Sequence, residues 1–213
     1  MILSASGLFI VMEGTDGSGT TTQGNLLAAE LGRRGWTVVR TSEPSGGDIG
    51  RLLRQVLQSR ATEPLVAEIV ALLFAADRID HCEREIRPAL ARGEAVVCDR
   101  YLGSSLAFQV TDGAGAFDAN WIRQINRGVL EPDLSVLVDV PIETAMARIE
   151  RRGKPLERFE VAPVLTEVRA RYHEAFAPGA VGLGKTALID GARPAEVVFA
   201  EVLSAVDGLS VAQ

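Results

Sequence analysis

Residues 8–22, LFIVMEGTDGSGTTT, decide the fold of this chain. The first five form a short apolar run, which is typical of a buried strand when a glycine-rich turn follows it. In that turn Gly14 and Gly19 are separated by four residues, the spacing of a loop that holds phosphate groups. The next segment, residues 22–34, has leucines at helical spacing. A strand, a glycine loop and a helix in this order predict a phosphate site at the amino end of the helix.

Short apolar runs and helical stretches alternate along the rest of the chain. Further strands are expected at 36–41, 95–98, 134–140 and 186–190. Further helices are expected at 49–58, 65–91, 101–109, 117–130, 142–151, 160–176 and 195–206. Continuous apolar strands that alternate with helices are typical of a parallel sheet covered on both faces. The prediction is one α/β domain over residues 1–213, with a five-stranded parallel sheet of the P-loop type and helices on both faces.

Composition excludes several classes of protein. The 213 residues, 47% of them hydrophobic, can bury a substantial core, and the formal net charge of −6 argues against a general nucleic-acid binder. No stretch approaches 18 apolar residues, and the first seven residues lack the basic flank of a signal peptide. Cys82 and Cys98 form no CxxC pair, which favours reduced thiols. We therefore expect a cytoplasmic protein that binds neither nucleic acid nor a membrane.

The phosphate loop departs from its usual pattern at one position. Lysine normally follows the second glycine and reaches the β and γ phosphates, but Thr20 stands there. The chain has two lysines, Lys154 and Lys185. Lys185 completes a full match to the motif at residues 179–186, GAVGLGKT, but this stretch follows a helix and precedes a strand, the reverse of the required order. We expect that second loop to be structural.

Charged side chains follow two of the expected strands. Glu43 and Asp99 come after the strands at 36–41 and 95–98, at the edge of the sheet where ligands bind. Carboxylates there can hold a magnesium-bound water or a sugar hydroxyl, and the hydroxyl of Thr21 is placed to bind Mg²⁺. Arg100 suits a bidentate clamp on a phosphate.

Five segments in this order resemble the thymidylate kinase family of nucleoside-monophosphate kinases. They are EGTDGSG at 13–19, TSEP at 41–44, LFAADR at 73–78, DRYLGSSLAFQ at 99–109 and the arginine-rich stretch 151–160. Each is common alone, but five in the right order and on the right elements are specific. The resemblance runs from residue 8 to about residue 206. It implies a P-loop kinase with a phosphate loop at 13–22, a mobile lid at approximately 148–160, ATP and Mg²⁺ at the site, and a homodimer.

The resemblance also implies a role for each matching residue. ATP would be held by Gly14, Thr15, Asp16, Gly17, Ser18, Gly19, Thr20, Thr21, Thr22, Arg148 and Arg152. The acceptor dTMP would be held by Glu43, Pro44, Arg54, Phe74, Arg78, Arg100, Ser104, Ser105, Phe108 and Gln109, with Phe74 stacked on thymine. Mg²⁺ would be held by Thr21 and Asp99, and catalysis would use Asp16, Arg100 and Arg158. The chain departs from the family at Thr20 and at Phe108, where the family usually has tyrosine.

The leading hypothesis is transfer of the γ-phosphate of ATP to dTMP, which gives ADP and dTDP. Phosphoryl transfer needs positioning and charge neutralisation rather than a covalent nucleophile. One alternative, which rests on Thr20, is a nucleotide-binding regulator of the same fold whose catalysis is weakened. The other is a kinase of deoxynucleosides or of another nucleoside monophosphate, with Glu43 as the candidate base for a nucleoside hydroxyl.

Overall fold

The computed structural model describes residues 7–58, 65–153 and 159–209. Its strands form one parallel sheet in the order β2-β3-β1-β4-β5. Their bounds are β1 (Leu8–Glu13), β2 (Val38–Ser42), β3 (Ala95–Asp99), β4 (Leu134–Asp139) and β5 (Lys185–Asp190). The predicted five-stranded parallel sheet is confirmed, and because the strands share one direction, their carboxyl ends meet at one edge.

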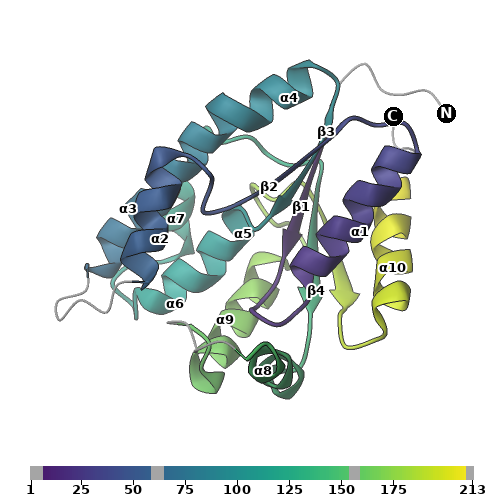
Figure 1. Ribbon diagram of the computed structural model, residues 1–213. Helices are drawn as coiled ribbons and strands as arrows, with labels where there is room; N and C mark the ends of the chain where they lie inside the picture. The colour runs from purple at the N-terminus through teal and green to yellow at the C-terminus, as the bar shows by residue number, and fades with distance from the viewer. Residues whose placement is uncertain (1–6, 59–64, 154–158, 210–213) are drawn as a thin grey trace.

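Alternate residues of the strands fill two separate cores, one on each face of the sheet. Ile10 and Met12 of β1 pack toward α1 (Thr20–Arg33) and α10 (Ala195–Asp207), while Phe9 and Val11 point to the opposite face. That face is covered by α3 (Ala67–His81), η1 (Cys82–Ile86), α4 (Arg87–Ala91), α5 (Leu102–Ser104), η2 (Ser105–Gln109), α6 (Val110–Asp112), α7 (Ala119–Ile125) and α9 (Ala162–Ala175). Figure 1 shows the two sets of helices on either side of the strands, so the prediction of helices on both faces is confirmed.

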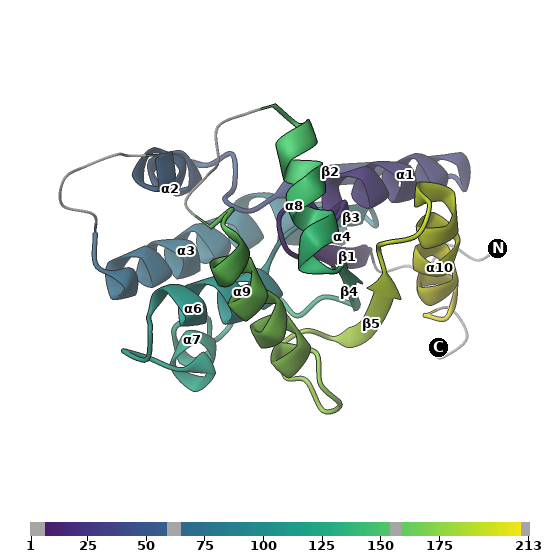
Figure 2. The same ribbon diagram turned by 90° about the horizontal axis from the view of Figure 1, so that it is seen from below.

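Two helices lie toward the carboxyl edge of the sheet, where the glycine loop also lies. They are α2 (Asp48–Gln58), which packs on α3, and α8 (Ile142–Arg151), which packs on α9. Figure 2 looks onto this edge and shows α8 in front of the strand ends, beside α9. The sheet edge and these helices therefore form the frame of the site.

Some helix boundaries differ from those expected. α1 begins at Thr20, two residues early, because Gly19 has a φ of 101° and turns the loop directly into the helix. The stretches 65–91 and 101–109 are helical, but each contains a π-helical segment, η1 or η2. The helix expected at 117–130 is limited to α7 (Ala119–Ile125), and the chain turns away at Gly128, which has a φ of 93°.

The second loop with the complete phosphate-loop pattern leads into the amino end of β5. Lys185 is the first residue of β5, and it is exposed at the edge opposite to the glycine loop. A Cβ on Gly184 would lie 1.8 Å from the carbonyl oxygen of Pro132, so this glycine is required by a close backbone approach. The place of Lys185 away from the ligand edge is as predicted. Among the described residues, no helix combines the length and apolarity needed to cross a membrane.

Candidate active site

The glycine loop between β1 and α1 is packed tightly against β4 and α8. A Cβ on Gly14 would lie 2.7 Å from the carbonyl oxygen of Val138, and a Cβ on Gly17 would lie 2.5 Å from that of Ala145. Gly17 and Gly19 also have positive φ values of 78° and 101°. The loop therefore requires glycine at these positions, and it presents the free N–H groups of the first turn of α1. Such an arrangement attracts anions.

Arg148 of α8 supports this loop from outside. Its guanidinium donates hydrogen bonds to the carbonyl oxygens of Gly17 (3.3 Å), Ser18 (3.0 Å) and Gly191 (2.9 Å). The second arginine predicted for ATP, Arg152, is about one-third exposed and pairs with the buried Glu160 at 2.7 Å. The structure thus places Arg148 against the loop backbone. Arg158 and Lys154 lie outside the described residues.

Thr21 and Asp99, the residues predicted to hold magnesium, are brought together across 78 positions of sequence. The Thr21 hydroxyl donates to Oδ2 of Asp99 at 2.5 Å. The other carboxylate oxygen, Oδ1, is buried and has no hydrogen-bond partner. A buried carboxylate oxygen left open beside a hydroxyl fits a hard cation with oxygen ligands, such as Mg²⁺.

Arg100 reaches from the end of β3 over the glycine loop. Its φ is 71°, a left-handed conformation that is uncommon for residues other than glycine and is often found at functional sites. The guanidinium donates to the carbonyl oxygen of Gly14 (2.7 Å) and to Oδ1 of Asp16 (2.8 Å), and it lies 4.9 Å from the centre of the Phe108 ring. Two of the residues predicted to be catalytic, Asp16 and Arg100, are therefore in direct contact.

Glu13 lies beneath Arg100 and was assigned no role from the sequence. Its Oε1 accepts a hydrogen bond from the Tyr101 amide (2.9 Å), and its Oε2 accepts from Ser104 Oγ (2.5 Å) and the Tyr172 hydroxyl (3.1 Å). Burial raises the pKa of Glu13, and the hydrogen bond from Ser104 and the charge of Arg100 offset this only in part. The sequence shows an acidic residue at the end of an apolar strand, which is a signal for a functional role of Glu13. Its contact with Tyr172 could not be predicted, because Tyr172 belongs to α9 and no motif connects α9 to β1.

A cavity of about 170 Å³ opens beside Arg100 and Asp16. The predicted acceptor residues that line it are Glu43, Pro44, Phe74, Arg78, Arg100, Ser104, Phe108 and Gln109. Three further residues that the sequence did not predict for the site also line it: Leu57, Tyr101 and Phe159. Oε1 of Gln109 is buried without a hydrogen-bond partner, so an acceptor is left open at this cavity.

The remaining predicted acceptor residues lie behind the lining. Arg54 donates to the carbonyl oxygens of Pro44 (2.5 Å) and Ser45 (2.6 Å), and thereby holds the segment after β2. Ser105 accepts a hydrogen bond from Arg78 at 2.9 Å. The structure therefore gathers the predicted acceptor set around one cavity, with Arg54 and Ser105 as supports of its wall.

Arg78 forms the floor of this cavity and is 1% exposed. Its Nε donates to Glu43 Oε2 (2.8 Å), Nη1 to Asn126 Oδ1 (2.5 Å) and Nη2 to the Tyr101 carbonyl (3.0 Å), in addition to Ser105. Most of the guanidinium donors are thus committed to the protein. A buried arginine with this many partners is held rigidly and fixes the shape of the floor.

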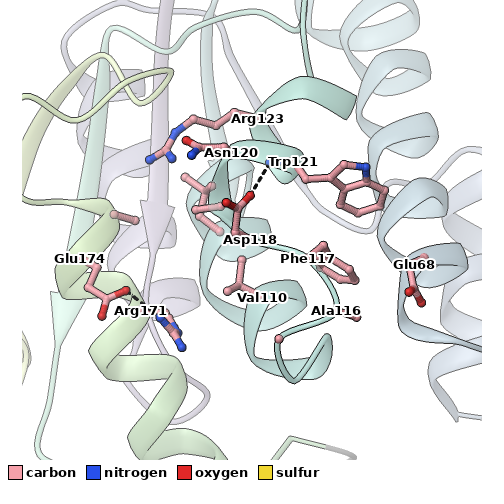
Figure 3. Close-up of a pocket in the computed structure, with 14 residues that line it drawn as sticks. Glu68, Val110, Ala116, Phe117, Asp118, Asn120, Trp121, Arg123, Arg171 and Glu174 are labelled. Atoms are coloured by element: carbon pink, nitrogen blue, oxygen red, sulfur yellow. Dashed lines mark hydrogen bonds and ion pairs between the residues drawn. The ribbon is translucent and has the colours of Figure 1, made fainter.

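A larger cavity, of about 830 Å³, lies away from the glycine loop, between α3, the segment before α7, and α9. Figure 3 shows Arg171 and Glu174 on one side of it and Glu68 on the other, near Phe117 and Trp121. Arg171 and Glu174 pair with each other at 3.1 Å. Charged side chains of both signs line this cavity, and its lining includes neither the phosphate loop nor the end of a strand. Size alone therefore does not make it the reaction site.

Comparison with known proteins agrees with this geometry. A family model for thymidylate kinase matches residues 12–202. A probable thymidylate kinase of Pyrococcus horikoshii is 41% identical over 169 residues, which cover 78% of this chain and 81% of that protein. Thymidylate kinases of Leifsonia xyli subsp. xyli and Bordetella pertussis are each 39% identical, over 95% and 96% of both chains respectively. The chain therefore belongs to the thymidylate kinase family and is an ATP-dependent nucleoside-monophosphate kinase.

Proposed function

We propose that this protein transfers the γ-phosphoryl group of ATP to the phosphate of dTMP and gives ADP and dTDP. The observation that carries the proposal is the contact between Arg100 and Asp16, which joins the phosphate loop to the acceptor cavity. A phosphate on the loop and a phosphate in the cavity would meet at this guanidinium. An arginine there suits the charge that spreads over the transferred group.

On the donor side, the loop from Gly14 to Thr22 holds the phosphates of ATP through its backbone N–H groups. Arg148 keeps the loop in place through its bonds to the Gly17 and Ser18 carbonyls. Arg152 and Arg158, in the lid at approximately 148–160, add positive charge over ATP. Thr21 and Asp99 hold Mg²⁺, which when bound neutralises the charge of the phosphates. The open Oδ1 of Asp99 supports this assignment.

On the acceptor side, Phe74 stacks on thymine and Gln109 binds its polar edge. The unpartnered Oε1 of Gln109 supports that contact. Arg100 grips the acceptor phosphate together with Arg54, whose guanidinium has further donors beyond the two that hold Pro44 and Ser45. Glu43, Pro44, Ser104, Ser105 and Phe108 complete the wall around the nucleoside.

We also propose that the protein acts as a homodimer in the cytoplasm, with all 213 residues in one domain. An exposed apolar patch, typical of an interface, lies at the start of α3 and in the two residues before it: Leu65, Val66, Ile69 and Leu72, which are from 41% to 58% exposed. Cys82 and Cys98 are buried and unpaired, which agrees with a reducing compartment.

The test is the rate of ADP formation from ATP and Mg²⁺ with dTMP, dUMP, thymidine or no acceptor. The proposal expects turnover that depends on dTMP. Nucleotide binding without any acceptor-dependent turnover would identify a regulator of the same fold instead. Turnover with thymidine but not with dTMP would identify a nucleoside kinase.

A further inference from the structure

Three elements of the fold meet at Ser45, which follows two residues of the acceptor cavity in the chain. Glu43 and Pro44 line the cavity, and Ser45 is 2% exposed. Ser45 lies between the end of β2 and the start of α2, and α2 packs on α3. Segment 43–45 is therefore a corner at which α2 and α3 can both hold the part of the cavity wall that follows β2.

Asp77 of α3 holds Ser45 by two hydrogen bonds. Its Oδ2 accepts from the Ser45 amide at 2.7 Å, and its Oδ1 accepts from the Ser45 hydroxyl at 2.5 Å. The hydroxyl oxygen in turn accepts from the amide of Gly47 at 3.1 Å. Asp77 is 1% exposed, and hydrogen bonds to a buried carboxylate are strong because the acceptor is charged and water is excluded. Asp77 thereby fixes both the backbone and the side chain of Ser45.

The carbonyl oxygen of Ser45 contacts α2. Nη2 of Arg54 donates to it at 2.6 Å, and Nη1 of Arg54 donates to the Pro44 carbonyl oxygen at 2.5 Å. A Cβ on Gly50 would lie 2.1 Å from the same Ser45 oxygen, so α2 is in close contact with the corner. Gly50 and Arg54 are four positions apart, which places them on one face of α2. Two carbonyl oxygens thus set the place of the Arg54 guanidinium, and Asp77 holds the residue that carries one of them.

We propose that Asp77 is a positioning residue of the acceptor site, which holds Ser45 in place so that Arg54 is aimed at the acceptor phosphate. The proposal rests on the proposed function, because it takes Arg54 to bind the phosphate of dTMP. Without the Asp77 carboxylate, the amide and the hydroxyl of Ser45 lose their acceptors in a buried place. The corner then shifts to reach new partners, and the carbonyl oxygens that anchor Arg54 shift with it.

Loss of the Asp77 carboxylate should weaken the binding of dTMP and leave the chemical step nearly unchanged. Arg100, which lies between the two phosphates, is held by Gly14 and Asp16 of the phosphate loop and keeps those contacts. A contact to the acceptor phosphate that forms in the ground state and persists in the transition state affects KM rather than kcat. We therefore expect Asp77→Ala to raise the KM for dTMP about tenfold, with kcat changed by less than about threefold and the KM for ATP by less than about twofold.

Two variants at position 77 separate hydrogen bonding from charge. Asp77→Ala and Asp77→Asn remove the same negative charge, but asparagine keeps an oxygen for the Ser45 amide and offers an N–H group to the hydroxyl oxygen. The KM for dTMP of Asp77→Asn should therefore stay within about threefold of the wild type. Equal changes of KM in the two variants would show an effect of charge and would overturn the proposal. Asp80→Ala is the matched control with an unchanged KM, because Asp80 is on the same helix but pairs with the exposed Arg84 at 2.5 Å.

A double-mutant cycle with Arg54→Ala tests whether Asp77 acts through that arginine. If it does, Asp77→Ala should raise the KM for dTMP by less than about threefold once Arg54 is absent. A rise of about tenfold in both backgrounds would mean that the two effects are independent, and it would overturn the proposed route.

Calorimetric titration with dTMP in the absence of ATP gives a readout that does not need turnover. The affinity should fall about tenfold in Asp77→Ala and much less in Asp77→Asn, with circular dichroism to show that each variant is folded. Ser45→Ala removes one of the two hydrogen bonds and should weaken binding in the same direction, which keeps the test valid if Asp77→Ala does not fold. Wild-type affinity in Ser45→Ala and in folded Asp77→Ala would overturn the role of Asp77 alone. Absence of both binding and turnover of dTMP in the wild type would overturn the proposed function.

Discussion

Arg100 shows how a single residue joins the two halves of the site. Its left-handed backbone, at a φ of 71°, costs about 1–3 kcal/mol in a residue with a side chain. The conformation turns the guanidinium back over the loop, where Gly14, Asp16 and the Phe108 ring hold it. Those contacts offset the strain and leave the guanidinium between the donor loop and the acceptor cavity.

The position of the missing lysine gives a first prediction. Thr20 is 6% exposed at the start of α1, and the guanidinium groups of Arg100 and Arg148 already contact the loop. Because these cations supply positive charge there, Thr20→Lys should change kcat by less than about tenfold. Removal of a hydrogen-bond donor that is needed in the transition state typically lowers kcat by about 10²–10³. Steady-state rates at saturating ATP and dTMP measure this. A gain of a hundredfold would mean that no other cation replaces the lysine.

Asp99 gives a second prediction at the same scale. Asp99→Asn removes the charge of the carboxylate whose Oδ1 has no hydrogen-bond partner. The Mg²⁺ concentration that gives the half-maximal rate should therefore rise at least about tenfold. A magnesium titration of the rate at fixed ATP measures the shift. Asp190→Asn is the matched control, because Asp190 also ends a strand but pairs with Arg193 at the far side of the sheet. Equal shifts in both variants would contradict the assignment of Asp99.

The short helix α5 lies close against the strand that carries the loop. A Cβ on Gly103 would lie 2.8 Å from Oε1 of Glu13 and 3.1 Å from the Phe176 ring. The hydrogen bonds from Ser104 and Tyr172 to Glu13 form in the same place, so β1, α5 and α9 meet at one buried carboxylate. The position of α9 is thereby fixed to the residue that precedes the phosphate loop.

This contact predicts that glycine-to-alanine substitutions at two positions change the free energy of unfolding in opposite directions. Gly103→Ala should lower the free energy of unfolding by about 1–3 kcal/mol, because the new methyl group overlaps Glu13. Gly32→Ala, in α1 with nothing within 4 Å of the added Cβ, should raise it by about 0.5–1 kcal/mol. Urea denaturation of both variants measures the two changes. A neutral Gly103→Ala would show that α5 can move away from β1.

At the scale of the whole molecule, the order of strands and helices was predictable because each strand is a short apolar run and each helix has a regular period. The residues at the strand ends were also predictable, since parallel strands place Glu43, Asp99 and Arg100 at one edge. The π-helical segments were not predictable, since a single extra residue in a turn leaves no mark in hydrophobic spacing. Contacts made by lone residues, such as Tyr172 with Glu13, depend on how α9 packs, which no local pattern encodes.

We expect the proposed dimer to form through the outer face of α3. Leu72 is 48% exposed there, on the apolar patch with Leu65, Val66 and Ile69. Leu72→Glu would bury a charge in a dimer interface but would leave the monomer core intact. Sedimentation velocity should therefore show a shift from dimer to monomer. The thermal unfolding temperature of the monomer should stay unchanged. Leu188→Glu is the control, because Leu188 is 58% exposed on β5, the edge strand at the other end of the sheet from β2. If Leu188→Glu dissociated the dimer and Leu72→Glu did not, the interface would lie at β5, and the acceptor cavity beside α3 would be formed without help from a second subunit.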